Sequence, residues 1–357
     1  MTEQGDLSNT SSHRSRVAAL DLARGLALLF MVMTHVRQYH GAPEVSYTAF
    51  GIVGRFLGAP LAAPTFMFLM GASQAFSTRA TLGRGIRRGL ELLALGYTLN
   101  VLRGTLPITI GVTLRLITLD EIAPHTASST FWNVDILQFA GTALIFLAVI
   151  RRFLPRPVHW LLLSALVAVA SPLLWGRMTG WPILDWVLSL LWGGHRGVVF
   201  AIFPWLSYPL AGMAFGQWLA ASARRGVLFR RAMLVAVCLA GAAAAAGYTD
   251  PQFPAGGYPF ARPIIVAWVI GLVLSWICVC HVLTGVVPAN PVFRLLFCWS
   301  SKVTTFYFFQ WLIICWAVPV IGYKRLGLPA TVVSTVVVLL LSDRAMRLWV
   351  RLKKRRT

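Results

Sequence analysis

The first long apolar run of the chain carries three side chains that could do chemistry, namely Asp21, Arg24 and His35. On an α-helix, which turns about 100° and rises about 1.5 Å per residue, Arg24 and His35 point within about 20° of each other and lie about 16 Å apart. Asp21 points about 60° from Arg24, so all three share one stripe. A charge at mid-membrane costs on the order of 3 kcal/mol or more. We therefore expect the stripe to face the bundle interior or a wet cavity.

An imidazole titrates near physiological pH, so His35 could act as a general base. Arg24 could hold an anionic group or stabilise a developing oxyanion. Simpler roles are open to the same residues: Asp21 and Arg24 could form an architectural ion pair, and His35 could cap the outer end of its helix. His40, five residues further on, is a second candidate for the base.

Composition places these residues in a membrane protein. Hydrophobic residues make up 57% of the 357 positions and charged residues only 12%, where a soluble domain has about 25% charged residues. Long apolar runs recur from end to end, which is typical of a polytopic membrane protein. The net charge of +21 does not indicate nucleic-acid binding, because the basic residues cluster in short segments between apolar runs.

The pattern predicts an all-α integral membrane bundle of about ten transmembrane helices with both termini cytoplasmic. The predicted spans are residues 17–37, 56–78, 88–106, 133–150, 158–175, 197–220, 230–248, 263–284, 303–322 and 328–350. We interpret residues 107–131 as an outer loop, and residues 176–196 as an interfacial helix with tryptophans at both ends. Residues 1–13 are polar and predicted to be a disordered cytoplasmic tail, and residues 14–357 a single transmembrane domain.

Basic residues alternate between the two sides of this predicted topology, which supports it. The inner segments hold clusters of arginine and lysine: Arg14 and Arg16; Arg79, Arg84, Arg87 and Arg88; Arg151, Arg152 and Arg156; Arg224, Arg225, Arg230 and Arg231; Arg294 and Lys302; and the C-terminal "RLKKRR". The outer segments hold fewer: Arg37, Arg103, Arg115, Arg177, Arg196, Arg262, Lys324 and Arg325.

Four segments resemble a known superfamily. "RVAALDLARGLALLFMVMTH", starting at residue 16, resembles the first helix of membrane acyltransferases, and Arg24 and His35 fit the Arg, ten residues, His spacing of the acyltransferase-3 type. Residues 64–76 ("PTFMFLMGASQAF"), 133–149 ("NVDILQFAGTALIFLAV") and 203–219 ("FPWLSYPLAGMAFGQWL") resemble the heparan-alpha-glucosaminide N-acetyltransferase type. The resemblance covers roughly residues 16–150 and 200–220.

The resemblance implies acyl transfer from a cytoplasmic donor such as acetyl-CoA to a hydroxyl or amine of a sugar-like acceptor on the outer side. The base is then His35 by the acyltransferase-3 pattern. By the pattern of the heparan-alpha-glucosaminide N-acetyltransferase type, which includes a lysosomal enzyme, the base is His40. That enzyme has an asparagine at the position of His35, and its histidine lies further into the following loop. We favour His35, because it shares its helical phase with Arg24.

Other residues are candidates for binding. Arg84, Arg87 and Arg88 could grip the phosphates of CoA, although the positive-inside rule alone also explains them. Ser73 belongs to a stretch of small residues that could admit a pantetheine arm or simply let helices pack closely. Asp135 and Gln138, three residues apart at the start of a span, could bind acceptor hydroxyls or face the outer water.

We expect no metal, since no zinc spacing, phosphate loop or serine-nucleophile motif is present. The expected partners are membrane lipids, an acyl-CoA and a sugar-like or other small-molecule acceptor, with no nucleic acid, and a homo-oligomer is compatible with the sequence. The predicted location is the bacterial inner membrane. A proton-coupled transporter using Asp21, Arg24 and His35 as a relay is the alternative function.

Overall fold

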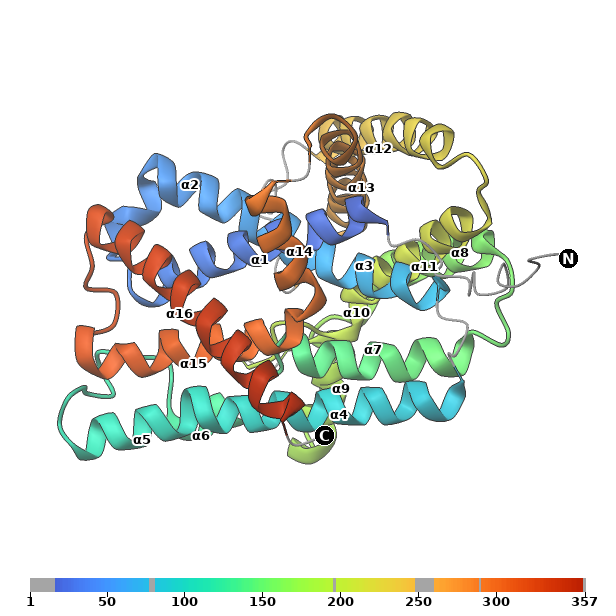
Figure 1. The fold of residues 1–357 in the computed structure, drawn as a ribbon. Helices are drawn as coiled ribbons and strands as arrows, with labels where there is room; N and C mark the ends of the chain where they lie inside the picture. Colours follow the sequence, from blue (N-terminus) through green and yellow to red (C-terminus); the bar gives the residue numbers. More distant parts are fainter. Residues whose placement is uncertain (1–16, 77–80, 195–196, 248–259, 289, 356–357) are drawn as a thin grey trace, which may run out of the picture.

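The computed structural model describes residues 17–76, 81–194, 197–247, 260–288 and 290–355, which form a bundle of helices (Figure 1). The predicted tail at residues 1–13 lies outside the described residues. Two isolated β-bridges, Gly41–Leu326 and Val134–Val198, join loops at the ends of helices. The all-α fold expected from the sequence is confirmed for the part of the chain that is described.

The helices follow one another with short connections. In chain order they are α1 Ala18–Tyr39, α2 Ala49–Phe56, α3 Ala63–Phe76, α4 Leu82–Asn100, α5 Leu106–Thr113, α6 Ala127–Phe131, α7 Ile136–Ile150, α8 Pro157–Leu174, α9 Pro182–Trp192, α10 Ile202–Trp205, α11 Ser207–Ala221, α12 Arg225–Gly247, α13 Pro263–Val286, α14 Pro291–Ser301, α15 Val303–Ile321 and α16 Leu328–Lys354. A short 3₁₀ turn, η1, spans Pro43–Tyr47, and two π turns interrupt longer helices, η2 at Leu57–Ala62 and η3 at Val101–Thr105.

Seven helical segments among the described residues are long and apolar enough to cross a membrane. They are α1, α2 to α3 as one run, α8, α12, α13, α15 and α16. The chain is therefore an integral membrane protein. The count of about ten spans and the cytoplasmic placement of both termini stay predictions.

Among the differences from the sequence-based expectation, three concern whole segments. The outer loop predicted at 107–131 is wrong for residues 107–113, because the π turn η3 carries the helix from α4 on into α5. The span predicted from residue 197 becomes helical only at Ile202, because residues 197–199 pair with Val134: the N–H of Val134 donates to Gly197 O at 2.8 Å and that of Val199 donates to Val134 O at 3.1 Å. Helix α14 was not predicted, although it has a clear start signal: Asn290 caps it and Pro291 is its first residue.

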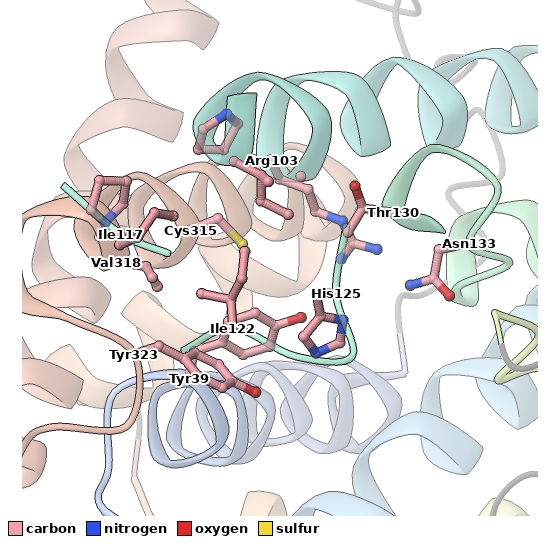
Figure 2. A pocket seen from close by; sticks show the side chains of 14 residues that line it. Tyr39, Arg103, Ile117, Ile122, His125, Thr130, Asn133, Cys315, Val318 and Tyr323 are labelled. Atoms are coloured by element: carbon pink, nitrogen blue, oxygen red, sulfur yellow. The ribbon is translucent and has the colours of Figure 1, made fainter. Parts of the chain in front are cut away.

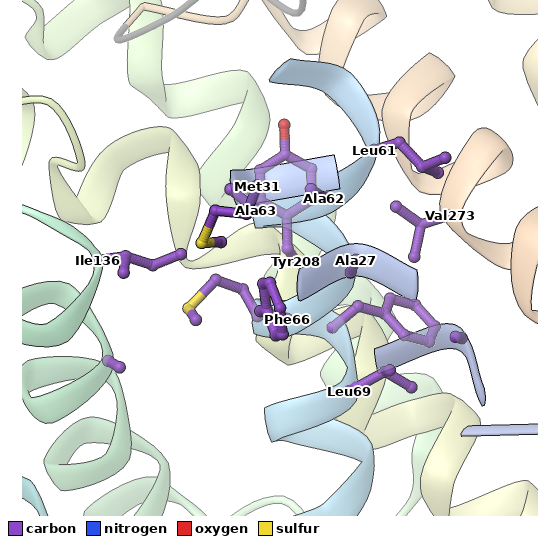
Figure 3. Packing of buried hydrophobic residues seen from close by; sticks show 14 of the residues in the cluster. Ala27, Met31, Leu61, Ala62, Ala63, Phe66, Leu69, Ile136, Tyr208 and Val273 are labelled. Carbon is purple, nitrogen blue, oxygen red and sulfur yellow. The ribbon is translucent and has the colours of Figure 1, made fainter. Parts of the chain in front are cut away.

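Helix α1 lies inside the bundle and packs against α13, α14, α15 and α16. Beside it, α3 and α11 approach so closely that a Cβ at Gly71 would overlap the backbone of Pro209, and one at Gly212 the backbone of Phe68. Small residues permit this contact between backbones, which is how many membrane helices associate. The apolar core between these helices includes Met31, Phe66 and Tyr208 (Figure 3).

The two ends of the bundle are distinguished by what meets α1. We call the end where α1 begins, near Ala18, the inner end, and the end where it finishes, at Tyr39, the outer end, following the predicted orientation. At the outer end the loop between α15 and α16 pairs with the chain after α1. The backbone N–H of Lys324 donates to Tyr39 O at 2.9 Å, and that of Leu326 donates to His40 O at 2.8 Å.

Candidate active site

His35 lies near the outer end of α1 and lines a cavity of about 970 Å³, which we call the outer cavity. Its ring stacks on Trp311 of α15 with the ring centroids 4.1 Å apart. The side-chain amide of Gln310 donates to Nδ1 of His35 at 2.8 Å. Two neighbours from α15 therefore fix the plane of the imidazole and engage one of its nitrogens.

A buried ion pair joins the same cavity. Nη2 of Arg103 lies 2.6 Å from Oδ2 of Asp135, and both side chains are at most 15% exposed. The hydroxyl of Tyr307 donates to the same carboxylate oxygen at 3.0 Å. The guanidinium of Arg103 also lies over the ring of Trp311, 4.3 Å from its centroid. Trp311 thus contacts both His35 and Arg103, so the imidazole and the ion pair form one connected group. We call it the outer group: His35, Arg103, Asp135, Tyr307, Gln310 and Trp311.

Local backbone features place these charges. Arg103 sits in the π turn η3, and π turns inside α-helices occur frequently at functional sites. Asp135 is the N-cap of α7, where Oδ1 accepts from the backbone N–H of Ile136 at 2.7 Å. Gln138 completes a capping box, its Oε1 accepting from the N–H of Asp135 at 3.2 Å. Gln138 is buried and does not line the cavity, so its position agrees with a capping role.

The second π turn, η2, forms another part of the cavity wall. It contains Pro60, which has no backbone N–H to donate to an ordinary helical hydrogen bond. Gly58 of this turn lines the cavity and lies directly against Thr34 of α1, where a Cβ would overlap the threonine side chain. The hydroxyl of Thr34 in turn donates to Gly54 O at 2.9 Å. Helix α2 is thereby held against the outer half of α1.

Aromatic rings gather beside Arg103 (Figure 2). Tyr39, His125 and Tyr323 contact one another with ring centroids 5.9 to 6.3 Å apart. Tyr39 and His125 line the large cavity, and all three rings line a side cavity of about 60 Å³. Burial and the nearby positive charge of Lys324 lower the pKa of His125, which lies in the loop before α6. These rings give the side cavity a flat, partly polar wall.

His40, the alternative base, is occupied elsewhere. Its side chain is 1% exposed. Nε2 donates to Ile314 O at 2.9 Å, and Nδ1 accepts from the hydroxyl of Ser334 at 2.9 Å. Both ring nitrogens are therefore engaged, and His40 is not among the residues that line the outer cavity.

Asp21 and Arg24 belong to a different group, which we call the inner cluster: Asp21, Arg24, Ser73 and Ser300. Nη1 of Arg24 lies 3.3 Å from Oδ1 of Asp21, and Nη2 donates to Ser73 Oγ at 3.0 Å. Ser300 donates to Asp21 Oδ1 at 2.8 Å. The structure joins α1, α3 and α14 through these contacts, but it does not bring Arg24 to His35.

A separate cavity of about 470 Å³, which we call the inner cavity, opens near the inner end, between the start of α4 and the end of α7. Arg84, Arg88 and Arg151 line it together with Gln74 and Thr81. Arg88 and Arg87 both pair with Glu91, at 3.2 and 3.1 Å. Arg87 does not line this cavity, and its side chain is 84% exposed. The three predicted arginines are thus split, with two at the cavity and one in solvent.

Sequence reasoning missed four residues of the outer group: Arg103, Tyr307, Gln310 and Trp311. Arg103 was counted only as a charge on the outer side. The other three lie in "FYFFQWLII", an apolar run in which a single glutamine was the one available signal. Among the described residues, no group of three or more His, Cys, Asp or Glu is arranged to hold a metal ion.

The chain matches a known family. The family profile for heparan-alpha-glucosaminide N-acetyltransferase, catalytic, matches residues 16–249, about two thirds of the chain. The chain therefore belongs to this family of membrane acetyltransferases, which confirms the resemblance seen in the sequence and does not favour a transporter. A comparison with curated proteins finds no match. Helix α15, which contributes Tyr307, Gln310 and Trp311, lies outside the matched residues.

Proposed function

We propose that the protein transfers an acetyl group from acetyl-CoA, bound at the inner cavity, to a hydroxyl or amine of a sugar-like acceptor bound at the outer cavity. The observation that carries the proposal is the group of His35, Arg103 and Asp135, which lines a large cavity in a chain of this acetyltransferase family. The outer cavity, with its aromatic wall, lies at the opposite end of the bundle from the inner cavity with its arginines.

In the proposed reaction His35 handles the proton. The acceptor heteroatom forms a bond to the thioester carbonyl carbon while Nε2 of His35 takes its proton. The carbon–sulfur bond then breaks, the acetyl group stays on the acceptor, and the departing thiolate takes the proton from the imidazolium. If instead the acetyl group first forms a bond with Nε2, the same nitrogen acts as a nucleophile and CoA leaves before the acceptor reacts.

Gln310 controls which nitrogen is available. Its amide N–H donates to Nδ1 in the structure, which leaves the proton of neutral His35 on Nε2. The amide oxygen of Gln310 is buried with no hydrogen-bond partner. An amide turned by half a rotation would accept from Nδ1–H and leave the lone pair of Nε2 for the acceptor. We therefore assign Gln310 a positioning role in the proposed mechanism.

Arg103 is better placed than Arg24 to stabilise the oxyanion. Its Nη1 is buried and makes no hydrogen bond, whereas Nη2 is held by Asp135 and by Asn100 Oδ1 at 3.2 Å. One guanidinium N–H group thus remains available for charge that develops on the thioester oxygen. Arg24 lies eleven residues before His35, about 16 Å away along α1.

The acyl arm must cross an apolar layer between the cavities. On α7, Ile136 lines the outer cavity and Leu144 lines the inner one, a separation of about 12 Å along the helix. The apolar core includes Phe66 and also Met31, which lines the outer cavity (Figure 3). A thioester on a long, slim arm could cross it by displacing such side chains, while the charged nucleotide stayed with the arginines.

The test uses sealed proteoliposomes in which the protein has one orientation. Acetyl-labelled acetyl-CoA is supplied on one side and a panel of amino sugars on the other, and products are identified by mass spectrometry. We expect transfer only with acetyl-CoA at the inner face. Arg88→Gln should raise the KM for acetyl-CoA about tenfold. Arg87→Gln is the matched control, since Arg87 lies off the cavity.

Two results would contradict the proposal. One is the absence of any acetyl-CoA consumption by folded protein with any acceptor in the panel. The other is an equal change of KM in the Arg87 and Arg88 variants, which would mean that the inner cavity does not select the donor.

A further inference from the structure

Two arginines lie at the outer end of the outer cavity without a carboxylate partner. Arg37 of α1 and Arg55 of α2 both line it. Nη1 of Arg37 donates to Ser46 Oγ at 2.9 Å, and Nη2 of Arg55 reaches Ser46 O at 3.5 Å. Neither guanidinium forms an ion pair with any carboxylate in the described part of the chain. Nε of Arg37 is buried and makes no hydrogen bond.

Their neighbourhood keeps the two positive charges together. The hydroxyl of Thr34 ties α1 to Gly54, the residue before Arg55. The shared contact with Ser46 brings the two side chains to one residue of the turn η1. Like charges held close repel each other, so the arrangement costs free energy unless an anion lies between them.

The charge balance of the cavity points the same way. Asp135 is the only acidic residue among its described lining residues, and Arg103 already pairs with it. Arg37 and Arg55 therefore leave this end of the cavity positive. Basic residues are less frequent on the outer side of a membrane protein, so two that face one cavity there are candidates for binding.

Resting on the proposed function, we propose that Arg37 and Arg55 form a subsite for an oxyanion of the acceptor, that is, a phosphate, sulfate or carboxylate group. Guanidinium groups suit such oxyanions because their N–H donors match two oxygens at once. Arg37 lies two residues beyond His35, about 3 Å further toward the outer end of α1. The acceptor would thus enter with its reacting hydroxyl or amine toward His35 and its anionic group at the mouth.

The anion can belong to a soluble acceptor or to the phosphate of a lipid-linked one, and the test separates these sources. Full-length protein in phosphatidylcholine nanodiscs is titrated, without acetyl-CoA, with glucosamine, glucosamine 6-phosphate and inorganic phosphate. A second preparation contains phosphatidylglycerol, and native mass spectrometry measures how much of this lipid is retained. Because no acetyl transfer is needed, failure here is distinguishable from failure of the proposed reaction.

We expect the phosphorylated sugar or the anionic lipid to bind wild-type protein at least tenfold more tightly than its neutral counterpart. The double variant Arg37→Gln/Arg55→Gln should lose that preference. Arg37→Lys/Arg55→Lys should keep part of it, because the charge remains without the paired donors. Arg177→Gln, at an exposed arginine away from the cavity, should bind like wild type.

The proposal is overturned if phosphate-bearing and neutral probes bind wild type equally in both preparations. It is also overturned if the preference survives in the double glutamine variant. Should that variant fail to fold, the lysine pair supplies the same test. A guanidinium subsite is equally contradicted if the lysine pair keeps the full wild-type preference for the phosphate-bearing probe and inorganic phosphate does not bind.

Discussion

Helix α1 carries two polar groups that look alike in sequence and differ in structure. The inner cluster of Asp21, Arg24, Ser73 and Ser300 is joined by contacts of 2.8 to 3.3 Å among three helices. The outer group around His35 faces a cavity of about 970 Å³ and keeps a buried N–H group of Arg103 without a partner. Both face the bundle interior, so facing inward does not by itself distinguish the two groups. The outer group is marked by a large cavity beside a guanidinium N–H group whose hydrogen-bonding capacity is unused.

The largest expected effect is at the outer ion pair. Arg103→Met leaves the Asp135 carboxylate buried without its cation, which should lower the free energy of unfolding by about 3–5 kcal/mol. Arg325→Gln is the matched control, because its pair with Glu121 is exposed at 65% and 41% and should contribute about 1 kcal/mol or less. Unfolding in detergent at a series of denaturant concentrations measures both. Equal losses would contradict the buried role assigned to Arg103.

A smaller effect is expected at the inner cluster. Arg24→Gln removes hydrogen bonds to Asp21 and Ser73, which should lower the free energy of unfolding by about 1–3 kcal/mol. Acetyl transfer per folded molecule should stay within about threefold of wild type, because Arg24 lies far along the helix from His35. A loss of turnover comparable to that of an Arg103 variant would erase the difference between the two groups.

The hydroxyl of Tyr307 provides a finer test of the outer group. Tyr307→Phe removes one hydrogen bond to Asp135 and keeps the ring, so about 1 kcal/mol of stability should be lost. Turnover should fall modestly while binding of acetyl-CoA at the inner cavity is unchanged. Isothermal titration with acetyl-CoA, beside the rate measurement, checks this split. Weaker acetyl-CoA binding would place Tyr307 in the donor site instead.

The smallest effect concerns pH. Burial and Lys324 lower the pKa of His125, so the folded protein binds this proton more weakly than the unfolded chain does. The contribution of His125 to the free energy of unfolding is therefore highest above about pH 6.5, the ordinary pKa of histidine. It decreases as the pH falls from there through the lower pKa of the folded state. The protection of the loop at residues 114–126 against hydrogen exchange, taken relative to the intrinsic exchange rate at each pH, should therefore fall at low pH. In His125→Gln this pH dependence should flatten.

Much of the fold could be predicted from the sequence, but only part of the candidate site. Apolar length and alternating arginines gave the helical membrane class, and the phase of Arg24 and His35 gave an inward stripe. That phase could not show that Arg24 meets Ser300, which lies 276 residues later. Nor could it show that Arg103 meets Asp135, because that contact depends on how the segment of α4 and η3 packs against α7. Trp311 and Gln310 are part of an apolar span whose contacts depend on how helices distant in the chain pack together.

The most direct test of the account is the acetyl-transfer rate of His35→Gln in the proteoliposome assay, compared with His281→Gln. His281 is a histidine of α13 that stacks on Phe229 and does not line the cavity. We predict a loss of about 100- to 10,000-fold for His35→Gln, with acetyl-CoA binding retained, and near wild-type rates for His281→Gln. Wild-type turnover in folded His35→Gln protein would contradict the central claim that this imidazole handles the proton or the acetyl group.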